Sequence, residues 1–175
     1  MIPILLSLAV IVILIVVIVA GQPDVFTVTR SSKISASPAE VFLHVNDLNA
    51  WENWSPWAKL DPDVKNSFAG AASGVGAAMS WAGNKKVGTG RMIITGSQPN
   101  ELIRIRLEFL KPFKATNAAK FIFQTEGDQS VVTWSMSGKN NFFFKVFGLF
   151  MNCDQMVGRD FEKGLANLKS VVEAT

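Results

Sequence analysis

Few side chains in this chain of 175 residues could perform acid–base or nucleophilic chemistry. The sequence has one histidine, one cysteine and no tyrosine. His44 could act as a general base near neutral pH and is the one candidate for a catalytic residue, with a solvent-facing or helix-capping role as the alternative. The lone Cys153 can form neither an intramolecular disulfide nor a thiol cluster for a metal. We therefore assign no catalytic residue and expect no metal site.

Motifs for cofactor chemistry are also missing from the sequence. Gly83 and Gly88 have the spacing of a phosphate-binding loop, but Thr89 stands where that loop needs a lysine. The run from Gly74 to Gly76 lacks the third glycine of a dinucleotide-binding fingerprint. Neither H-E-x-x-H nor G-x-S-x-G occurs. We expect no cofactor, and the sequence leaves open whether the protein is an enzyme.

Aromatic and methionine side chains indicate a different chemistry, the burial of apolar surface. The chain has five tryptophans and thirteen phenylalanines, and three of the tryptophans fall in WENWSPW at residues 51–57. Such residues usually build a core, yet they also suit the wall of an apolar ligand site in which methionines supply adaptable surface. Both interpretations stay open. The residues predicted to contact a ligand are Trp54, Trp57, Met79, Trp81, Phe109, Phe123, Trp134, Met136 and Phe147.

The elements that must position these residues give an α+β pattern. Ser37, Pro38 and Glu40 mark a helix start with a capping box, and the helix is expected to end near Asn46. Segments typical of strands cover residues 25–34, 77–82, 87–97, 102–110, 115–125 and 130–137. The short turns between the later segments favour an antiparallel meander.

Alternation within the strands predicts which face is buried. In residues 102–110, apolar side chains such as Ile103 and Ile105 alternate with charged ones such as Arg104 and Arg106. The same rule places most of the predicted ligand-contacting residues on one concave face. Apolar residues then recur at helical spacing from 157 to 172, which predicts an amphipathic helix long enough to lie across that face. The apolar run 142–151 is expected to plug the cavity mouth or to touch a membrane.

The N-terminal residues 1–20 carry no charged side chain. About 20 apolar residues are enough to span a bilayer core. A cleaved signal peptide is the alternative, but no basic residue precedes Arg30 and residues 18–20 are a poor cleavage site. We expect residues 1–22 to form a transmembrane anchor and residues 23–175 to form one domain, giving a single-pass membrane protein. Arg30 and Lys33 favour a cytoplasmic domain, and the other side of the membrane remains open.

Three segments carry a resemblance to a known family. The sequences KISASPAEVF, WENWSPW and GRDFEKGLANLK, with the strand-rich stretch between them, resemble the START-like superfamily (SRPBCC), in its polyketide cyclase/dehydrase-like branch, over roughly residues 25 to 173. The resemblance implies a helix-grip fold, in which a curved antiparallel sheet wraps around a long C-terminal helix. It also implies a cavity for an apolar ligand.

Three functions are compatible with these observations. The first is a membrane-anchored domain that binds a lipid or another hydrophobic small molecule in an internal cavity. The second is an enzyme similar to polyketide cyclases or dehydratases, for which His44 and scattered carboxylates offer a poor set of catalytic groups. The third is a structural or interaction domain whose cavity is filled by its own side chains.

Charge adds one further observation. The net charge is +3, and the stretch from Lys85 to Lys120 contains eight basic residues but only two acidic ones. Such a cluster is usually a solvated sheet face, although it could also attract anionic headgroups. We do not expect a nucleic-acid partner, because exposed stacking motifs are missing.

Overall fold

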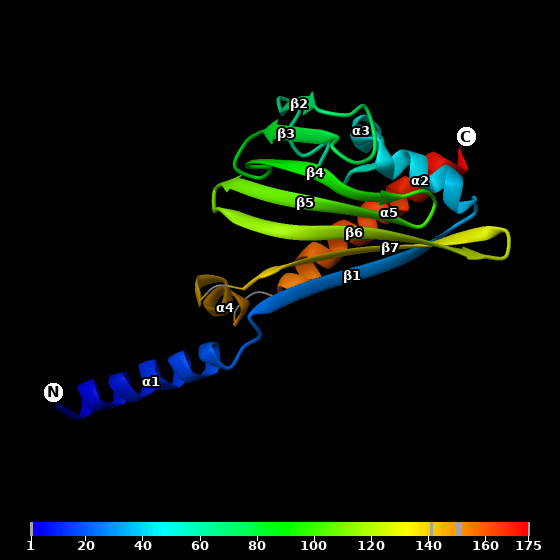
Figure 1. Ribbon diagram of the computed structural model, residues 1–175. Helices are drawn as coiled ribbons and strands as arrows, with labels where there is room; N and C mark the ends of the chain where they lie inside the picture. The colour runs from blue at the N-terminus through cyan, green and yellow to red at the C-terminus, as the bar shows by residue number, and fades with distance from the viewer. Residues whose placement is uncertain (1, 141, 150–151, 175) are drawn as a thin grey trace.

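The computed structural model describes residues 2–140, 142–149 and 152–174, except for some side chains within the helices (Figure 1). The elements in chain order are α1 (Ile2–Ala20), β1 (Val25–Ile34), α2 (Pro38–Asn46), the 3₁₀ turn η1 (Leu48–Ala50), α3 (Trp51–Trp54), β2 (Lys65–Ala69), β3 (Ala78–Ala82), β4 (Thr89–Gln98), β5 (Leu102–Lys111), β6 (Ala115–Glu126), β7 (Gln129–Lys139), α4 (Phe142–Gly148) and α5 (Cys153–Glu173).

Seven strands form one antiparallel sheet in the order β1-β7-β6-β5-β4-β3-β2. Strands β2 to β7 follow one another as a meander, and β1 joins the far edge by pairing with β7 along its whole length. Helix α5 crosses behind the sheet in the view of Figure 1, with α2 and α3 beside its C-terminal half and α4 near its start. This arrangement confirms the predicted α+β helix-grip fold.

Strand β2 was not predicted. Its sequence, KNSFA, has three polar residues in succession, so it shows no alternation of large apolar side chains. All of its residues are exposed, and it forms one edge of the sheet with β3 as its neighbour. Because an edge strand with no buried face needs no apolar pattern, residues 65–69 carry no strand signal.

The strand register confirms the predicted buried face. Trp134 on β7 lies opposite Phe121 on β6, which lies opposite Ile103 on β5. These three side chains are buried, whereas their neighbours Arg104 and Lys120 are exposed on the other face. Register shifts in the β4–β5 pairing interrupt the ladder at two points, and such irregularities bend a sheet around what it covers.

The predicted helix start at Ser37 is also confirmed. The Glu40 amide donates to the Ser37 hydroxyl oxygen, and the Ser37 amide donates to the Glu40 carboxylate at 2.7 Å, which completes the capping box. The hydrogen bonds from the Ser37 amide and hydroxyl lower the pKa of Glu40. At the other end of the chain, the Asn152 side chain caps α5 by accepting from the Gln155 amide at 3.1 Å.

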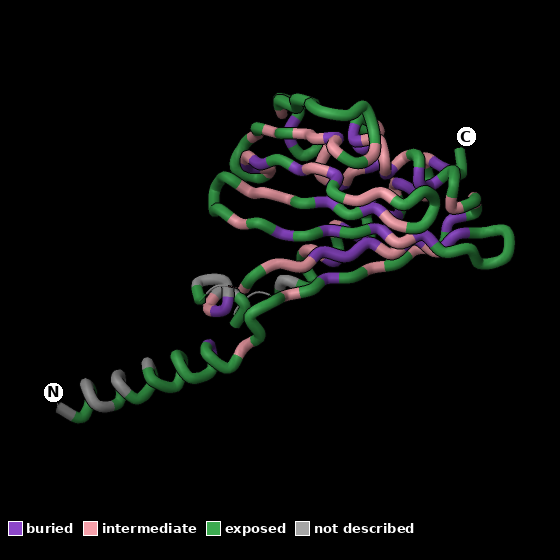
Figure 2. The backbone as a smooth tube through the Cα atoms, viewed as in Figure 1, coloured by how far each residue is buried: buried purple, intermediate pink, exposed green. Residues whose placement is uncertain are grey.

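Burial is concentrated in the sheet and in the helices packed on it, whereas the described part of α1 is mostly exposed (Figure 2). The buried side of α5 is formed by Phe161, Leu165, Leu168 and Val172, and Val157 is half-buried. This pattern confirms the amphipathic helix that the spacing predicted. Ridges of large apolar side chains on α5 therefore pack into the concave face of the sheet.

The N-terminal helix α1 projects away from the sheet (Figure 1). A transmembrane helix needs about 20 consecutive apolar residues. No helix in the described part of the chain is long and apolar enough to cross a membrane. The anchor predicted over residues 1–22 is therefore not supported, and the predicted single-pass membrane location with a cytoplasmic domain is wrong. The sequence interpretation rested on the length, apolar character and lack of charge of residues 1–20 and on the lack of a good signal-peptide cleavage site.

Candidate functional site

Of the nine residues that the sequence predicted to contact a ligand, six lie on the inward face of the sheet: Met79, Trp81, Phe109, Phe123, Trp134 and Met136. Trp54 ends α3, Trp57 follows it, and Phe147 belongs to α4. Eight of the nine have described side chains, while the side chain of Phe147 lies outside the described residues. The eight fall into two groups. Trp54, Phe123, Trp134 and Met136 are buried, whereas Trp57, Met79, Trp81 and Phe109 are half-buried. The two groups differ in what lies over them.

A closed aromatic cluster, made of Trp51, Trp54, Phe121, Trp134 and Phe161, fills the part of the concave face beneath the middle of α5. Phe161 from α5 stacks on Trp134 with ring centroids 4.0 Å apart, and Phe121 stacks on the same indole at 4.8 Å. Trp51 and Trp54 lie 4.6 Å apart and both meet Trp134 edge to face. Offset and edge-to-face contacts of this kind stabilise a core beyond their buried area.

Local hydrogen bonds hold the tryptophans of this cluster. The Trp51 indole N–H donates to the Val45 carbonyl at 2.9 Å, and the Trp54 indole N–H donates to the His44 carbonyl at 3.1 Å. The short helix α3 therefore folds back onto the end of α2. Asn167 on α5 donates to the Trp54 carbonyl at 3.1 Å, which ties the long helix to the same turn.

Glycine at position 164 lets α5 approach the cluster closely. A Cβ atom there would lie 2.8 Å from Cζ3 of Trp134 and 3.0 Å from Cδ of Pro56. Trp57, whose ring centroid lies 5.7 Å from that of Trp134, donates its indole N–H to Asp160 at 3.3 Å. At this end of the sheet, the concave face is filled by the protein's own side chains.

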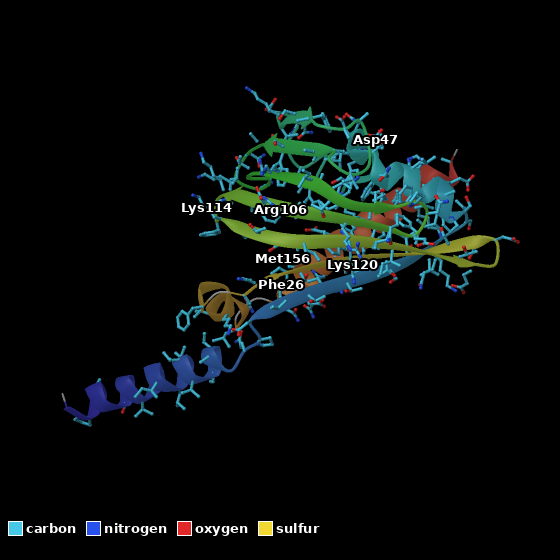
Figure 3. All side chains as sticks on the ribbon, in the orientation of Figure 1. Phe26, Asp47, Arg106, Lys114, Lys120 and Met156 are labelled. Carbon is cyan, nitrogen blue, oxygen red and sulfur yellow. The ribbon has the colours of Figure 1, made fainter. Side chains whose placement is uncertain are left out.

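The other end of the concave face is less covered. Five large apolar residues there stay half-buried, and we call them the half-buried face: Phe26, Met79, Trp81, Leu107 and Phe109. They lie on one surface because Met92 of β4 pairs with both Met79 and Leu107. Phe26, at the start of β1, lies at the end of the sheet near the start of α5 (Figure 3).

Trp81 lies flat along this face because β4 has a glycine beneath it. A Cβ atom at Gly90 would lie 2.4 Å from the Trp81 ring. The Trp81 indole N–H donates to the Val87 carbonyl at 3.3 Å, and its ring meets Phe109 edge to face with centroids 6.0 Å apart. Two aromatic rings thus form a fixed apolar wall at the β3–β5 side of the half-buried face.

An ionic contact fastens the start of α5 to β1. The Arg30 guanidinium donates to Asp154 at 3.0 Å and to Glu162 at 2.7 Å. The hydrogen bonds that Arg30 donates to these carboxylates raise the pKa of Arg30, and Arg30 in turn lowers the pKa of Asp154. A Cβ atom at Gly158 would lie 2.0 Å from the guanidinium, so the glycine leaves the space in which Arg30 passes under the helix.

Helix α4 is fastened to the chain that precedes β1. Lys145, whose side chain is buried, donates to the Asp24 carboxylate at 2.6 Å, and this contact lowers the pKa of Asp24. The Asn140 amide also donates to the Asp24 carbonyl at 2.7 Å. These bonds keep α4 near the end of the sheet where the half-buried face lies.

His44, the candidate catalytic residue, lies on α2 beside the closed aromatic cluster. Its carbonyl accepts the Trp54 indole N–H, but its imidazole has no hydrogen-bond partner among the described residues. Within the same part of the chain, no three histidine, cysteine, aspartate or glutamate residues come together as a metal site would require. The structure does not bring His44 together with the half-buried face.

Two surface depressions lie elsewhere on the domain. One, of about 170 Å³, is lined by Leu48, Asn49, Ala77, Ala78 and residues 68–72. The other, of about 490 Å³, is lined by residues 35–38, Glu40, Thr125 and residues 127–129. Neither is lined by a residue that the sequence predicted to contact a ligand.

A seven-stranded antiparallel sheet curved around a long C-terminal helix defines the helix-grip class of protein. The chain belongs to the polyketide cyclase / dehydrase and lipid transport family, whose model matches residues 25–173. This match confirms the family resemblance stated from the sequence. No match was found among the curated proteins.

Solved structures share the fold at low sequence identity. Protein CV1439 from Chromobacterium violaceum is 15% identical with a TM-score of 0.60, and the match covers 87% of this chain and 99% of that one. Protein MLL2253 from Mesorhizobium loti is 16% identical with a TM-score of 0.60, covering 86% and 98%. DynU16, from the dynemicin biosynthetic locus, is 14% identical with a TM-score of 0.59, covering 87% and 48%.

Proposed function

We propose that this protein binds a lipid or another apolar small molecule on the half-buried face of the sheet. The observation that carries the proposal is the contrast between the two ends of the concave face. Side chains of the closed aromatic cluster stack on one another, whereas Met79, Trp81 and Phe109 remain partly exposed on the same surface. Large apolar side chains that stay partly exposed on a concave surface are typical of ligand sites.

The driving force would be the removal of apolar surface from water. Each Å² of apolar surface buried stabilises a complex by roughly 25 cal/mol, before the cost of lost motion is subtracted. Trp81 and Phe109 supply rigid rings, and Met79 supplies a flexible side chain that adapts to the ligand's shape. The start of α5, where Val157 is half-buried and Met156 is exposed, would cover the ligand from the other side.

Binding is better supported than catalysis. Along the rows of β3 to β7 that carry the half-buried face, the described side chains are apolar, glycine or asparagine, with no histidine or carboxylate among them. General acid–base chemistry needs a titratable group within hydrogen-bond reach of the substrate. The cyclase/dehydratase alternative therefore has no supporting residue on this face. The third possibility, a filled cavity, is supported at the closed aromatic cluster.

Neighbouring residues on β5 give a matched test. Phe109 belongs to the half-buried face, and the next residue, Leu110, has no partner on β4 at a register shift and is 46% exposed. We would titrate the full chain and the variants Phe109→Gln and Leu110→Gln with the uncharged naphthalene dye prodan and follow its fluorescence. We expect saturable binding that Phe109→Gln weakens roughly tenfold, as expected for about 1.4 kcal/mol of lost contact, and that Leu110→Gln leaves unchanged.

Two results would count against the proposal. One is the lack of any saturable prodan signal with the full chain. The other is an equal effect of the two substitutions, which would place the dye on exposed apolar surface outside the half-buried face, such as α1. Native mass spectrometry of the purified chain adds an independent readout, because a bound apolar molecule adds a fixed mass that solvent extraction removes.

A further inference from the structure

One polar side chain is buried among the apolar residues of this face. Asn117 lies on β6, and the residue is only 9% exposed. In the sheet it pairs with Leu107 on β5 and with Gly138 on β7. Its neighbours on the same face of β6 are Ala115 and Ala119. A single amide group therefore sits on the floor of an otherwise apolar surface.

The hydrogen-bonding capacity of Asn117 is largely unused. An asparagine side chain offers two N–H donors and a carbonyl oxygen that accepts twice. Its Nδ2 lies 3.7 Å from the Met136 sulfur, which is a weak acceptor. No described residue donates to its Oδ1. Oδ1 of Asn117 is not among the fully buried side-chain atoms that lack a partner, so it is within reach of solvent, and a ligand hydroxyl group could replace water there.

Small residues around Asn117 give its side chain a defined place. A Cβ atom at Gly138 would lie 2.1 Å from Oδ1 of Asn117 and 2.8 Å from the Phe26 ring. The amide therefore extends over Gly138 toward Phe26, in space that any larger residue at position 138 would occupy. Because Ala115 and Ala119 are also short, the polar atoms of Asn117 are not covered by neighbours on their own strand.

We infer that the ligand of the half-buried face is a neutral apolar molecule bearing a hydroxyl group that hydrogen-bonds to Asn117. This inference rests on the proposed function. A hydroxyl both donates and accepts, so it can satisfy the Oδ1 atom and the amide N–H groups of one asparagine.

A charged head group does not fit the same place. An ion buried beside an asparagine and apolar side chains would lose its hydration without gaining an opposite charge. On the concave face of β1, the cationic side chain among the described residues is that of Arg30. Its guanidinium is already paired with the carboxylates of Asp154 and Glu162. A neutral alcohol or phenol is therefore favoured over a carboxylate or a phosphate ester.

Two probes of nearly equal shape test this inference. 2-Naphthol carries a hydroxyl where 2-methylnaphthalene carries a methyl group, and each would be used to displace prodan from the full chain. One neutral hydrogen bond corresponds to a roughly three- to tenfold preference for 2-naphthol. In Asn117→Leu that preference should fall to about one, with 2-methylnaphthalene bound as well as before or more tightly. Thr116→Val, on the opposite face of β6, should keep the preference of the unmodified chain.

Each outcome separates this inference from the proposed function. If both probes displace prodan equally from the unmodified chain, or if Asn117→Leu keeps the preference, the ligand class is wrong while apolar binding stands. If prodan itself does not bind in a Phe109-dependent way, the proposed function fails and the inference fails with it. Thermal unfolding of Asn117→Leu adds a readout without ligand. A marked loss of stability together with an unchanged preference would show that Asn117 acts only as a structural residue.

Discussion

The indole of Trp134 and the ring of Phe161 stack with their centroids 4.0 Å apart and their planes inclined by 6°. One residue comes from the central part of β7 and the other from the middle of α5. This contact joins the sheet to the helix that crosses it, and with Phe121 and Trp54 it closes the concave face at that end. The size of any ligand is therefore limited by where this stack begins.

Removing the ring of Phe161 should strongly destabilise the fold. Phe161 is 1% exposed, and a Phe→Ala substitution in a well-packed core costs about 3–5 kcal/mol. We expect the free energy of unfolding of Phe161→Ala, measured by denaturant titration, to fall by about that amount. Phe68→Ala on β2, where the ring is 47% exposed, is the control and should cost less than about 1 kcal/mol. Equal losses in the two variants would contradict the central role of the stack.

Stability should depend on pH through Arg30 and Asp154. Because Arg30 lowers the pKa of Asp154 in the folded state, this pair stabilises the fold above the unfolded pKa of aspartate. The contribution is lost as the pH falls through the lower, folded pKa of Asp154. In Arg30→Gln, we therefore expect a smaller loss of stability than in the unmodified chain as the pH is lowered from about 6 to about 3.

The comparison of the two pH profiles is the relevant measurement for this pair. Other carboxylates with a lowered pKa, such as Asp24 and Glu40, contribute acid sensitivity to both proteins, so only the difference reports on Arg30. Urea midpoints recorded at several pH values would provide it. Parallel profiles over this range would show that the ion pair has no effect on stability.

Removing the capping box of α2 should lower stability by a modest amount. Ser37→Ala removes the hydroxyl oxygen that accepts the Glu40 amide, and the loss of a helix N-cap costs about 1 kcal/mol. Ser170→Ala, an exposed position within α5, is the control and should change stability by less than about 0.5 kcal/mol. Thermal unfolding followed by circular dichroism would compare the two. An unchanged melting temperature for Ser37→Ala would contradict the predicted cap.

Substituting Asp61 should reduce stability more than is usual for a loop residue. Its buried carboxylate accepts from the backbone N–H of Asn84 at 2.6 Å and from the backbone N–H of Asp63 at 3.1 Å. The first of these bonds connects the β3–β4 turn to the loop before β2. Asp61→Ala should cost about 1–3 kcal/mol because it leaves these donors unpaired. Asp63→Ala, at an exposed residue nearby, should cost less than about 1 kcal/mol. Hydrogen exchange at the Asn84 amide should accelerate only in Asp61→Ala.

Much of the fold could be predicted from local patterns. Alternation in residues 102–110 assigns Ile103 and Ile105 to the buried face because the side-chain period of a strand is two. The capping residues Ser37 and Glu40 marked the start of α2 for a similarly local reason. Strand β2 could not be predicted, because an exposed edge strand is held by backbone hydrogen bonds that do not depend on side-chain type.

The candidate site was less predictable than the fold. Aromatic content alone could not distinguish Trp134, which is stacked within a core, from Trp81, which lies on the half-buried face. The difference depends on tertiary packing, because Phe161 of α5 stacks on Trp134, whereas Trp81 packs against Phe109 within the sheet. Asn117 was missed, although its place on β6 has the same parity as the inward-facing Phe121 and Phe123. One signal for Asn117 was available in the sequence: it is a polar residue at a position where the alternation of β6 predicts an apolar one.

Several glycines of this domain leave a volume that a larger side chain from another element occupies. Asn117 lies over Gly138, Trp81 over Gly90, and Arg30 under Gly158. Two residues far apart in the sequence therefore share one volume. A larger side chain at one of the two positions fits only if the side chain at the other is smaller. Among relatives that share this architecture, positions 117 and 138 should accordingly vary together, with a bulkier residue at one accompanied by a shorter residue at the other.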